Sequence, residues 1–229
     1  MENGKVKSIK IHTGSRAKNK ANRNYMLEME KIAGMFKEST ETEGGSLKPR
    51  ILLHVCCAPC FSGSIESLTD WADVTAFFFN PNMNSEEEYD RRAAELKRFI
   101  KEASLNVPVI IRKYEPAVFY KTVRGLENVP EGGVRCDKCF ALRLRETAAY
   151  AKEKGFDFFT TTLSLSPLKN AERIVRIGEV IGNDLGVSYL PSDFKKKDGF
   201  KRSLELSKEY GLYRQDYCGC VYSMRDEIS

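Results

Sequence analysis

The sequence lacks any long apolar run and has few histidines. No uncharged apolar segment approaches the roughly 20 residues that a transmembrane helix needs, and the first residues lack the apolar stretch of a secretory signal. We therefore expect a protein that stays in the cytoplasm and has no membrane partner. Of the two histidines, His12 falls in an N-terminal arm and His54 inside an expected strand, so neither is expected to join a metal site.

Length and composition suit one globular domain preceded by a basic extension. The chain has 229 residues, of which 41% are hydrophobic and 30% charged. Its excess of 37 Lys and Arg over 32 Asp and Glu lies entirely within residues 1–50, which hold 11 basic and 6 acidic groups. Three interpretations of this basic leader are open. It attracts a polyanion such as RNA, it is a flexible leader, or it is a transit peptide. Within it we expect a helix over Tyr25–Phe36 and a linker over Ser39–Pro49.

From residue 51 onward, short apolar runs alternate with helical patterns. The expected strands cover Ile51–Cys56, Val74–Phe79, Val107–Ile111, Phe156–Leu163 and Val187–Leu190. Helical patterns follow a possible capping box at Ser85 and Glu88, and recur over residues 140–154, 174–181 and 199–210. This alternation predicts an α/β fold, a parallel sheet with helices on both faces, over residues 51–229.

The seven cysteines occur only in clusters, and they are Cys56, Cys57, Cys60, Cys136, Cys139, Cys218 and Cys220. Clusters of this kind in a reduced compartment bind metal or perform redox chemistry more often than they form a disulfide scaffold. The first cluster ends the first strand, and the second is expected in a loop just before the helix at residues 140–154. Both places lie at the carboxyl edge of the sheet, where such folds bind ligands.

Several interpretations of the thiols remain open from the residues alone. Arg135, Lys138 and Arg143 flank the second pair and lower thiol pKa values, which favours metal or iron–sulfur ligation. A structural zinc site with four cysteines is a second interpretation, and thiols that merely fill the core are a third. The Cys218-Gly219-Cys220 turn suits either an easily reduced disulfide or another pair of metal ligands.

Separate blocks of the sequence resemble one known family. They are Leu52-Leu53-His54-Val55-Cys56-Cys57-Ala58-Pro59-Cys60, Phe79-Asn80-Pro81-Asn82, Glu88-Tyr89 with Arg92, Arg135-Cys136 with Cys139 and Arg143-Leu144, Thr161-Thr162-Leu163 with Ser166-Pro167 and Lys169, Asp193-Phe194-Lys195-Lys196 with Gly199, and Gln215 with Tyr217-Cys218-Gly219-Cys220. Over residues 51–223 the chain resembles the epoxyqueuosine reductases of the QueH type. Two departures are Lys195, where the family often has Arg, and Met83-Asn84 in place of an apolar residue and Pro.

The resemblance implies a Rossmann-like, HUP-type fold and the reduction of epoxyqueuosine to queuosine in tRNA, the last step in making that wobble base. It implies a 4Fe-4S cluster held by Cys56, Cys57, Cys136 and Cys139, and a redox-active disulfide between Cys218 and Cys220. Cys60 stands where the family has Cys or Asp, and is a candidate ligand of an adjacent mononuclear iron. The cysteines replace the phosphate loop of related ATP-binding enzymes, which argues against ATP and against a sulfur-transferring tRNA enzyme.

Further assignments concern the partners. The expected partners are tRNA carrying epoxyqueuosine and an electron donor that the sequence does not identify. The candidate phosphate contacts are Lys195, Lys196, Lys197, Lys201 and Arg202, the candidate stacking residues are Phe194, Tyr213 and Tyr217, and the candidate proton donors are Asp137, Tyr217 and Asp193. The lysine run also suits an ordinary solvated face. The alternative functions are a zinc-stabilised RNA-binding module and a metal-free thiol–disulfide oxidoreductase.

Overall fold

The computed structural model describes residues 23–43 and 48–224, so the leader before residue 23 lies outside the described residues. Its core is a five-stranded sheet in the order β3-β2-β1-β4-β5, in which all neighbouring strands are parallel. The strands are β1 (Arg50–His54), β2 (Asp73–Phe78), β3 (Val109–Ile111), β4 (Phe158–Thr161) and β5 (Ser188–Tyr189). The predicted parallel α/β sheet is confirmed.

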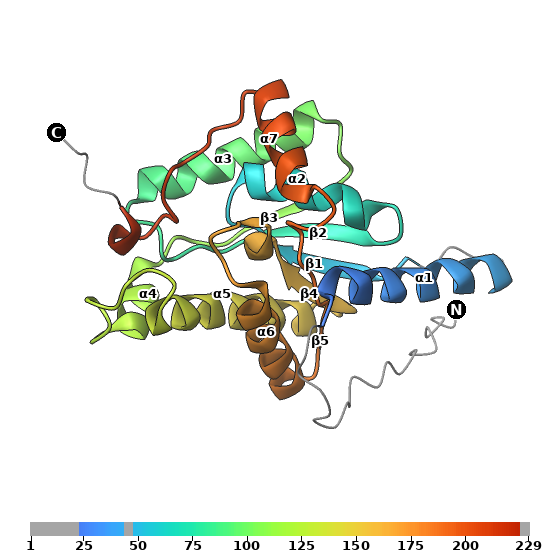
Figure 1. Cartoon of the computed structure of the whole chain (residues 1–229), viewed down its shortest axis with the longest axis horizontal. Helices are drawn as coiled ribbons and strands as arrows, with labels where there is room; N and C mark the ends of the chain where they lie inside the picture. The colour runs from blue at the N-terminus through green and yellow to red at the C-terminus, as the bar shows by residue number, and fades with distance from the viewer. Residues whose placement is uncertain (1–22, 44–47, 225–229) are drawn as a thin grey trace.

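Helices cover both faces of the sheet (Figure 1). One face carries α2 (Ala58–Thr69), α3 (Glu86–Glu102) and α7 (Gly199–Glu209), and the other carries α4 (Pro116–Val123), α5 (Val134–Glu153) and α6 (Ala171–Leu185). Two short 3-10 helices, η1 (Thr162–Leu165) and η2 (Val221–Ser223), follow β4 and precede the end of the described chain. No described helix has the length and apolar character needed to cross a membrane.

The central strand shows why the sequence forms this sheet. All residues of β1 after Arg50 are buried, as expected for a strand covered on both faces. Ile51 and Leu53 pack in the core with α2 and α3, whereas Leu52 packs in the core with α5 and α6. Alternate side chains of one strand thus belong to two hydrophobic cores, because successive residues point to opposite faces.

The expected helix at residue 25 is present, but it is longer than predicted. Helix α1 (Tyr25–Glu43) extends into the expected linker. Met29 is buried in the core beside Ile51, and the Phe36 ring contacts the rings of Trp71 and Phe158 at centroid distances of 6.3 and 6.0 Å. The apolar residues that sequence periodicity detected therefore attach α1 to the amino ends of the strands, at the opposite end of the molecule from the C-terminal segment (Figure 1).

Four strands are shorter than predicted, and they are β1, β3, β4 and β5. The expected strand over Phe156–Leu163 ends at Thr161, where the hydroxyl of Thr161 accepts a hydrogen bond from the backbone N–H of Leu163 and begins η1. Threonine side chains that bond to nearby backbone groups compete with the sheet ladder in this way. An apolar run does not reveal this change of conformation.

His54 has a structural role, as the sequence suggested. Its ring is fully buried, with Nε2 placed to donate to the carbonyl of Phe79 at 3.1 Å and Nδ1 to accept from the Thr161 hydroxyl at 2.8 Å. Burial, and after it the nearby positive charge of Arg143, lower the pKa of His54 to about 4. The imidazole therefore joins β1 to β2 and β4 as a neutral group.

The depressed pKa makes stability depend on pH. Between about pH 6.5 and pH 4 the unfolded chain protonates this histidine more readily than the folded chain does, so its contribution is complete above pH 6.5 and declines toward pH 4. We expect a loss on the order of 3 kcal/mol across that window in metal-free wild-type protein, and a smaller loss in His54→Gln. Urea unfolding of both proteins at several pH values measures this, and parallel pH curves would contradict it.

Two glycines allow α2 and α7 to pack closely. A Cβ on Gly63 would lie 2.6 Å from the carbonyl oxygen of Gly199 and 2.7 Å from the Cβ of Ser203, both on α7. We expect Gly63→Ala to lower the free energy of unfolding by about 1–3 kcal/mol, because a packed interface must separate to admit the methyl group. Gly34→Ala in α1 is the matched control, since nothing lies within 4 Å of its Cβ position, and it should be neutral or slightly stabilising. Equal effects of the two substitutions in urea unfolding would disprove the packing argument.

Candidate active site

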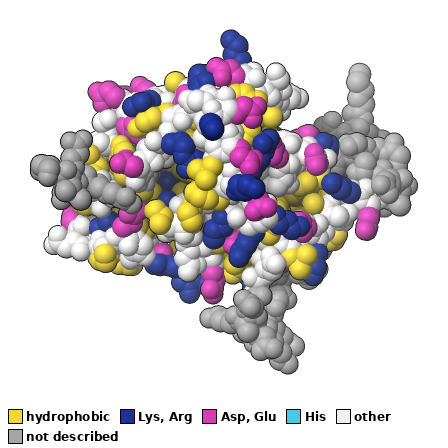
Figure 2. All heavy atoms as spheres, turned by 45° about the horizontal axis from the view of Figure 1, so that its top comes forward, with side chains coloured by type: hydrophobic (Ala, Val, Ile, Leu, Met, Phe, Trp, Pro, Cys, Tyr) yellow, Lys and Arg dark blue, Asp and Glu magenta, His cyan; other side chains and the backbone are white. Residues whose placement is uncertain are grey.

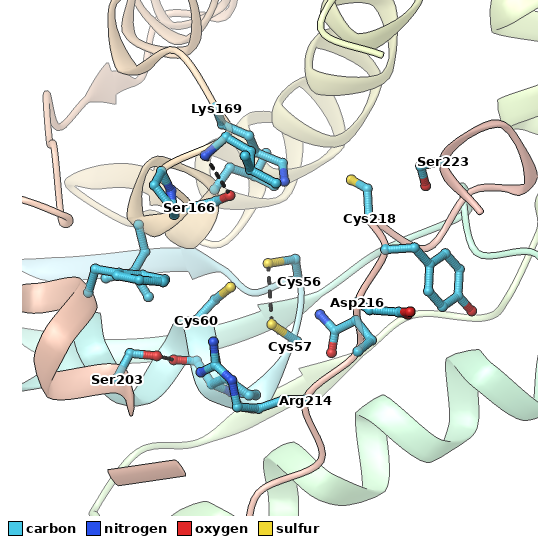
Figure 3. Close-up of a pocket in the computed structure, with 18 of the residues that line it drawn as sticks. Cys56, Cys57, Cys60, Ser166, Lys169, Ser203, Arg214, Asp216, Cys218 and Ser223 are labelled. Carbon is cyan, nitrogen blue, oxygen red and sulfur yellow. Dashed lines mark hydrogen bonds between the residues drawn. The ribbon is translucent and has the colours of Figure 1, made fainter. Parts of the chain in front are cut away.

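The first cysteine cluster lies where β1 passes into α2. Cys56 follows the strand, Cys57 is the N-cap residue of α2 in an extended conformation, and Pro59 in the first turn fixes the helical start. The sulfur atoms of Cys56 and Cys57 are 3.8 Å apart, and those of Cys56, Cys57 and Cys60 all lie within 4.8 Å of one another. The three thiols point toward one another in Figure 3.

Hydrogen bonds among these three thiols shift their pKa values in opposite directions. Hydrogen bonds from Cys57 and then Cys60 hold the pKa of the Cys56 thiol well below its usual range, and Lys169 also lowers it. The same bond to Cys56 raises the pKa of Cys57 to about 12, and hydrogen bonding to Cys56 and Cys57 raises that of Cys60. This arrangement favours the deprotonated form at Cys56 and the protonated form at its two neighbours in the metal-free protein.

The second cysteine pair lies inside a helix, which corrects the predicted loop. Helix α5 begins at Val134 after the N-cap Gly133, so Cys136 and Cys139 occupy its first turns. Gly132 has a φ of +82°, and its backbone N–H donates to the Cys136 sulfur at 3.2 Å. The turn at Gly132 and Gly133 lets the helix begin at Val134, whereas apolar periodicity predicted a start at residue 140. Burial raises the pKa of Cys136, and that of Cys139 to about 12.

The C-terminal segment returns over the carboxyl ends of the strands. The carbonyl of Gly219 accepts a hydrogen bond from the Asn84 N–H at 2.8 Å, and the Tyr217 hydroxyl donates to the Asn84 side chain at 2.8 Å. Gly219 has a φ of +113°, and a Cβ there would lie 3.2 Å from a guanidinium nitrogen of Arg92. The backbone conformation therefore favours glycine between Cys218 and Cys220, and a side chain there would also crowd the Arg92 guanidinium.

All seven cysteines line two adjacent cavities. The larger, of about 220 Å³, is lined by Cys56, Cys57, Cys60 and Cys218, and the smaller, of about 10 Å³, by Cys136, Cys139, Cys218 and Cys220. Glu131, Arg143 and Cys218 line both. In Figure 3, Cys218 faces the first cluster from the C-terminal segment. The convergence of three distant segments, which the sequence predicted, is present in the folded chain.

The structure groups the thiols less tightly than the predicted cluster ligation would require. Among described residues, the set of potential metal ligands within 4.8 Å of one another consists of Cys56, Cys57 and Cys60, without Cys136 and Cys139. All seven thiols are free, including those of Cys218 and Cys220. The assignment of four ligands and of a redox-active disulfide therefore stays a prediction. Soft thiolate donors at two helix N-termini still suit zinc or an iron–sulfur cluster.

The cavity also contains three cationic residues to which sequence reasoning gave no role. They are Arg92, Lys169 and Arg214, and the same cavity is lined by Arg143, which the sequence already placed beside the second cysteine pair. Arg92 is buried and forms an ion pair with Glu88 at 2.5 Å, one helical turn earlier. The i,i+4 spacing of Glu88 and Arg92 in the sequence is the signal that would have predicted this pair. Burial next to thiols is not visible in the sequence.

The structure shows which candidate stacking residues and proton donors already contact other groups. Phe194 is only 2% exposed and packs in the hydrophobic core, so it is unavailable for stacking on a base. Tyr213 lies under the guanidinium of Arg91 at 3.5 Å and donates to Glu88, whereas Tyr217 lines the cavity. Asp137 forms an ion pair with Arg173, and Asp193 forms one with Lys195 at 2.6 Å. Of the aromatic candidates, Tyr217 lines the cavity, and the guanidinium carbon of Arg92 lies 5.3 Å from the centroid of its ring.

Comparison with known proteins identifies the family. Residues 51–226 match the family described as epoxyqueuosine reductase QueH. The epoxyqueuosine reductase QueH of Streptococcus pyogenes serotype M1 is 42% identical over 206 residues, which cover 88% of this chain and 78% of that protein. The protein of the same description from Thermotoga maritima is 37% identical over 180 residues, which cover 76% of this chain and 90% of that protein.

Among solved structures, the chain is similar to the U34-tRNA thiolase NcsA from Methanococcus maripaludis with its 4Fe-4S cluster. The TM-score is 0.46 at 14% sequence identity, and the match covers 86% of this chain and 69% of that one. The family itself rests on the sequence matches. The resemblance seen in the cysteine and arginine blocks is thereby confirmed, and the chain belongs to the epoxyqueuosine reductase QueH family of oxidoreductases.

Proposed function

We propose that this protein reduces the epoxide of epoxyqueuosine in tRNA to the cyclopentene of queuosine. The observation that carries the proposal is the convergence of all seven cysteines, from three distant segments, on two adjoining cavities at the carboxyl edge of the sheet. A structural zinc site uses four thiols and closes around its metal, whereas here the four thiols of the larger cavity and several cations border open space. Family membership supplies the substrate class.

The residues present suit an iron–sulfur cofactor. Cys56, Cys57, Cys136 and Cys139 would hold a 4Fe-4S cluster, and Cys60 would be free to ligate an adjacent mononuclear iron. Such a cofactor supplies single electrons and a Lewis-acidic metal. Helix N-termini behind both cysteine pairs, at α2 and α5, favour the deprotonated thiols that ligation requires.

Cys218 and Cys220 have the placement of a second electron source. Removing the epoxide oxygen as water consumes two electrons and two protons. Oxidation of two thiols to a disulfide releases the same number of each, so the two half-reactions balance. Cys218 borders both cavities, and Cys220 is buried beside Ser223, with its sulfur 3.4 Å from the hydroxyl. An external donor, which we do not identify, must reduce the pair again after each turnover.

The larger cavity would receive the modified base. An anticodon base must leave its stack to reach a recessed site, and aromatic or cationic side chains then hold it. Tyr217 and Phe200 line the cavity, and Arg214 and Lys169 offer positive charge to substrate oxygens or to a nearby phosphate. Lys169 and Cys56 face the cavity from different sides in Figure 3. A base that enters between them would bring its epoxide toward the thiol cluster.

The tRNA surface is less basic than the lysine run suggests. Lys195, Lys197 and Arg202 form ion pairs with Asp193, Glu30 and Glu66, respectively. On the face shown in Figure 2, acidic side chains are interspersed among the basic ones. Within the described part of the chain, Lys196 and Lys201 form no ion pair, so these two amines are the available phosphate contacts of the run.

The metal content tests the cofactor. In protein reconstituted without oxygen we expect about four iron and four sulfide per chain, with further iron if a second ion binds. Cys136→Ser should lose the cluster, whereas Cys218→Ser should keep it and lose activity on tRNA. Zinc at about one per chain, with no sulfide after reconstitution, would disprove the proposal in favour of a structural zinc module.

The lysine run is tested by salt-dependent binding. Lys196→Ala should weaken tRNA binding and reduce the salt slope by about 0.7, the contribution of one phosphate contact on a single strand. Lys97→Ala removes the same charge from an exposed position in the C-terminal half of α3 and is the control. If both variants bind tRNA with the wild-type salt dependence, Lys196 is not in the interface.

A further inference from the structure

Arg143 is a buried cation that the reaction outlined above does not use. It lies on α5 one turn after Cys139, and its side chain is among the largest in the chain that are fully buried. Nε lies 3.4 Å from the carbonyl of Cys139, and Nη1 lies 3.5 Å from the side-chain oxygen of Asn80. Asn80 in turn donates to the carbonyl of Val55 at 2.9 Å, so the guanidinium is held against the end of β1.

No carboxylate of the described residues forms an ion pair with this guanidinium, although the exposed Glu131 also lines both cavities. In residues 23–43 and 48–224, Arg143 has no acidic partner within 4 Å, and its Nη2 has no hydrogen-bond partner at all. Arg92, the other deeply buried arginine beside the cysteines, has Glu88 at 2.5 Å. A buried charge without a counter-ion is destabilising, because the two long hydrogen bonds and the Phe140 ring, 5.7 Å from the guanidinium carbon, replace its hydration only in part. The compensating anion of Arg143 must therefore come from another source.

The surrounding groups show what that anion is. Arg143 borders both cavities, with the first cysteine cluster in one and Cys136 and Cys139 in the other. Each of the four proposed cluster ligands therefore shares a cavity wall with the guanidinium. A cluster held by four thiolates is an anion, and one-electron reduction makes it more negative by one charge. A fixed positive charge stabilises the reduced form more than the oxidised form.

We infer that Arg143 is the counter-cation of the metal cluster, a positioning residue that helps to retain the cluster and raises its reduction potential. The inference rests on the cluster proposed above. In the metal-free protein the same charge is nearly unbalanced, so the folded apoprotein tolerates Arg143 at a cost in stability that cluster binding removes. Burial of Arg143 is thus unfavourable in the metal-free protein alone. An ordinary packing role would instead stabilise both the metal-free and the cluster-bound protein.

Three variants test the inference in the full-length chain. Arg143→Met keeps most of the side-chain volume without charge, Arg143→Lys keeps the charge, and Arg145→Gln removes an exposed arginine of the same helix that is paired with Asp184 at 2.9 Å. Each protein is reconstituted without oxygen, assayed for iron and sulfide, and titrated with dithionite in the presence of redox mediators. Thermal unfolding is then measured with and without the cluster.

The expected results differ between the variants. Reduction of the cluster in Arg143→Met should be at least tenfold less favourable, a shift of about 59 mV to lower potential for one electron, or the cluster should be lost. Arg143→Lys should retain the cluster with a potential between those of the wild type and Arg143→Met, and Arg145→Gln should match the wild type. Metal-free Arg143→Met should unfold at the wild-type temperature or above it.

Three results would contradict the inference. If Arg143→Met holds a full cluster at the wild-type potential, the inference is wrong and the proposed function is unaffected. If metal-free Arg143→Met unfolds well below the metal-free wild type or fails to fold, the side chain has a packing role and the inference is again wrong. If wild-type protein binds no iron and sulfide, both proposals fail, because the anion that Arg143 requires does not exist.

Discussion

Charge balance at the carboxyl end of β1 is the constraint on which the site depends. Thiols are brought together there from three segments, and each deprotonated thiol needs positive charge nearby. The fold provides it in two ways, through helix N-termini at α2 and α5 and through cationic side chains that border the cavity. Glu88 balances Arg92, but no described carboxylate balances Arg143. The site is therefore suited to an anion, and thiolate-bound metal is the anion that its donors can hold.

The same constraint explains the course of the C-terminal segment. Gly219 passes close to the guanidinium of Arg92, and its neighbours Cys218 and Cys220 thereby reach the wall of the second cysteine pair. Hydrogen bonds from Asn84 and Tyr217 hold this segment over the loop after β2. A residue with a side chain at 219 would be strained at this φ, and the Arg92 guanidinium would have to move by a few tenths of an ångström. The glycine between the two cysteines therefore has a conformational reason.

Much of the fold was predictable because its signals are local. Apolar runs located all five strands, although they overestimated β4, since the bond from Leu163 to the Thr161 hydroxyl ends the strand. The start of α5 was missed, because the glycine turn before Val134, and not an apolar residue, sets it. The stacking role predicted for Phe194 was wrong. An aromatic residue within a basic run is expected to be exposed, but tertiary packing buries this one.

The sequence by itself determined the parallel α/β order, the clustering of seven thiols and the family, because these depend on residue type and spacing along the chain. Only the tertiary structure decided which charges are neutralised. Lys195 and Lys197 are paired with acids, whereas Arg143 is buried without one. Such pairings join residues far apart in sequence, and burial sets their energy. The physical character of the site, a set of thiols facing an unbalanced cation, therefore exists only in the folded chain.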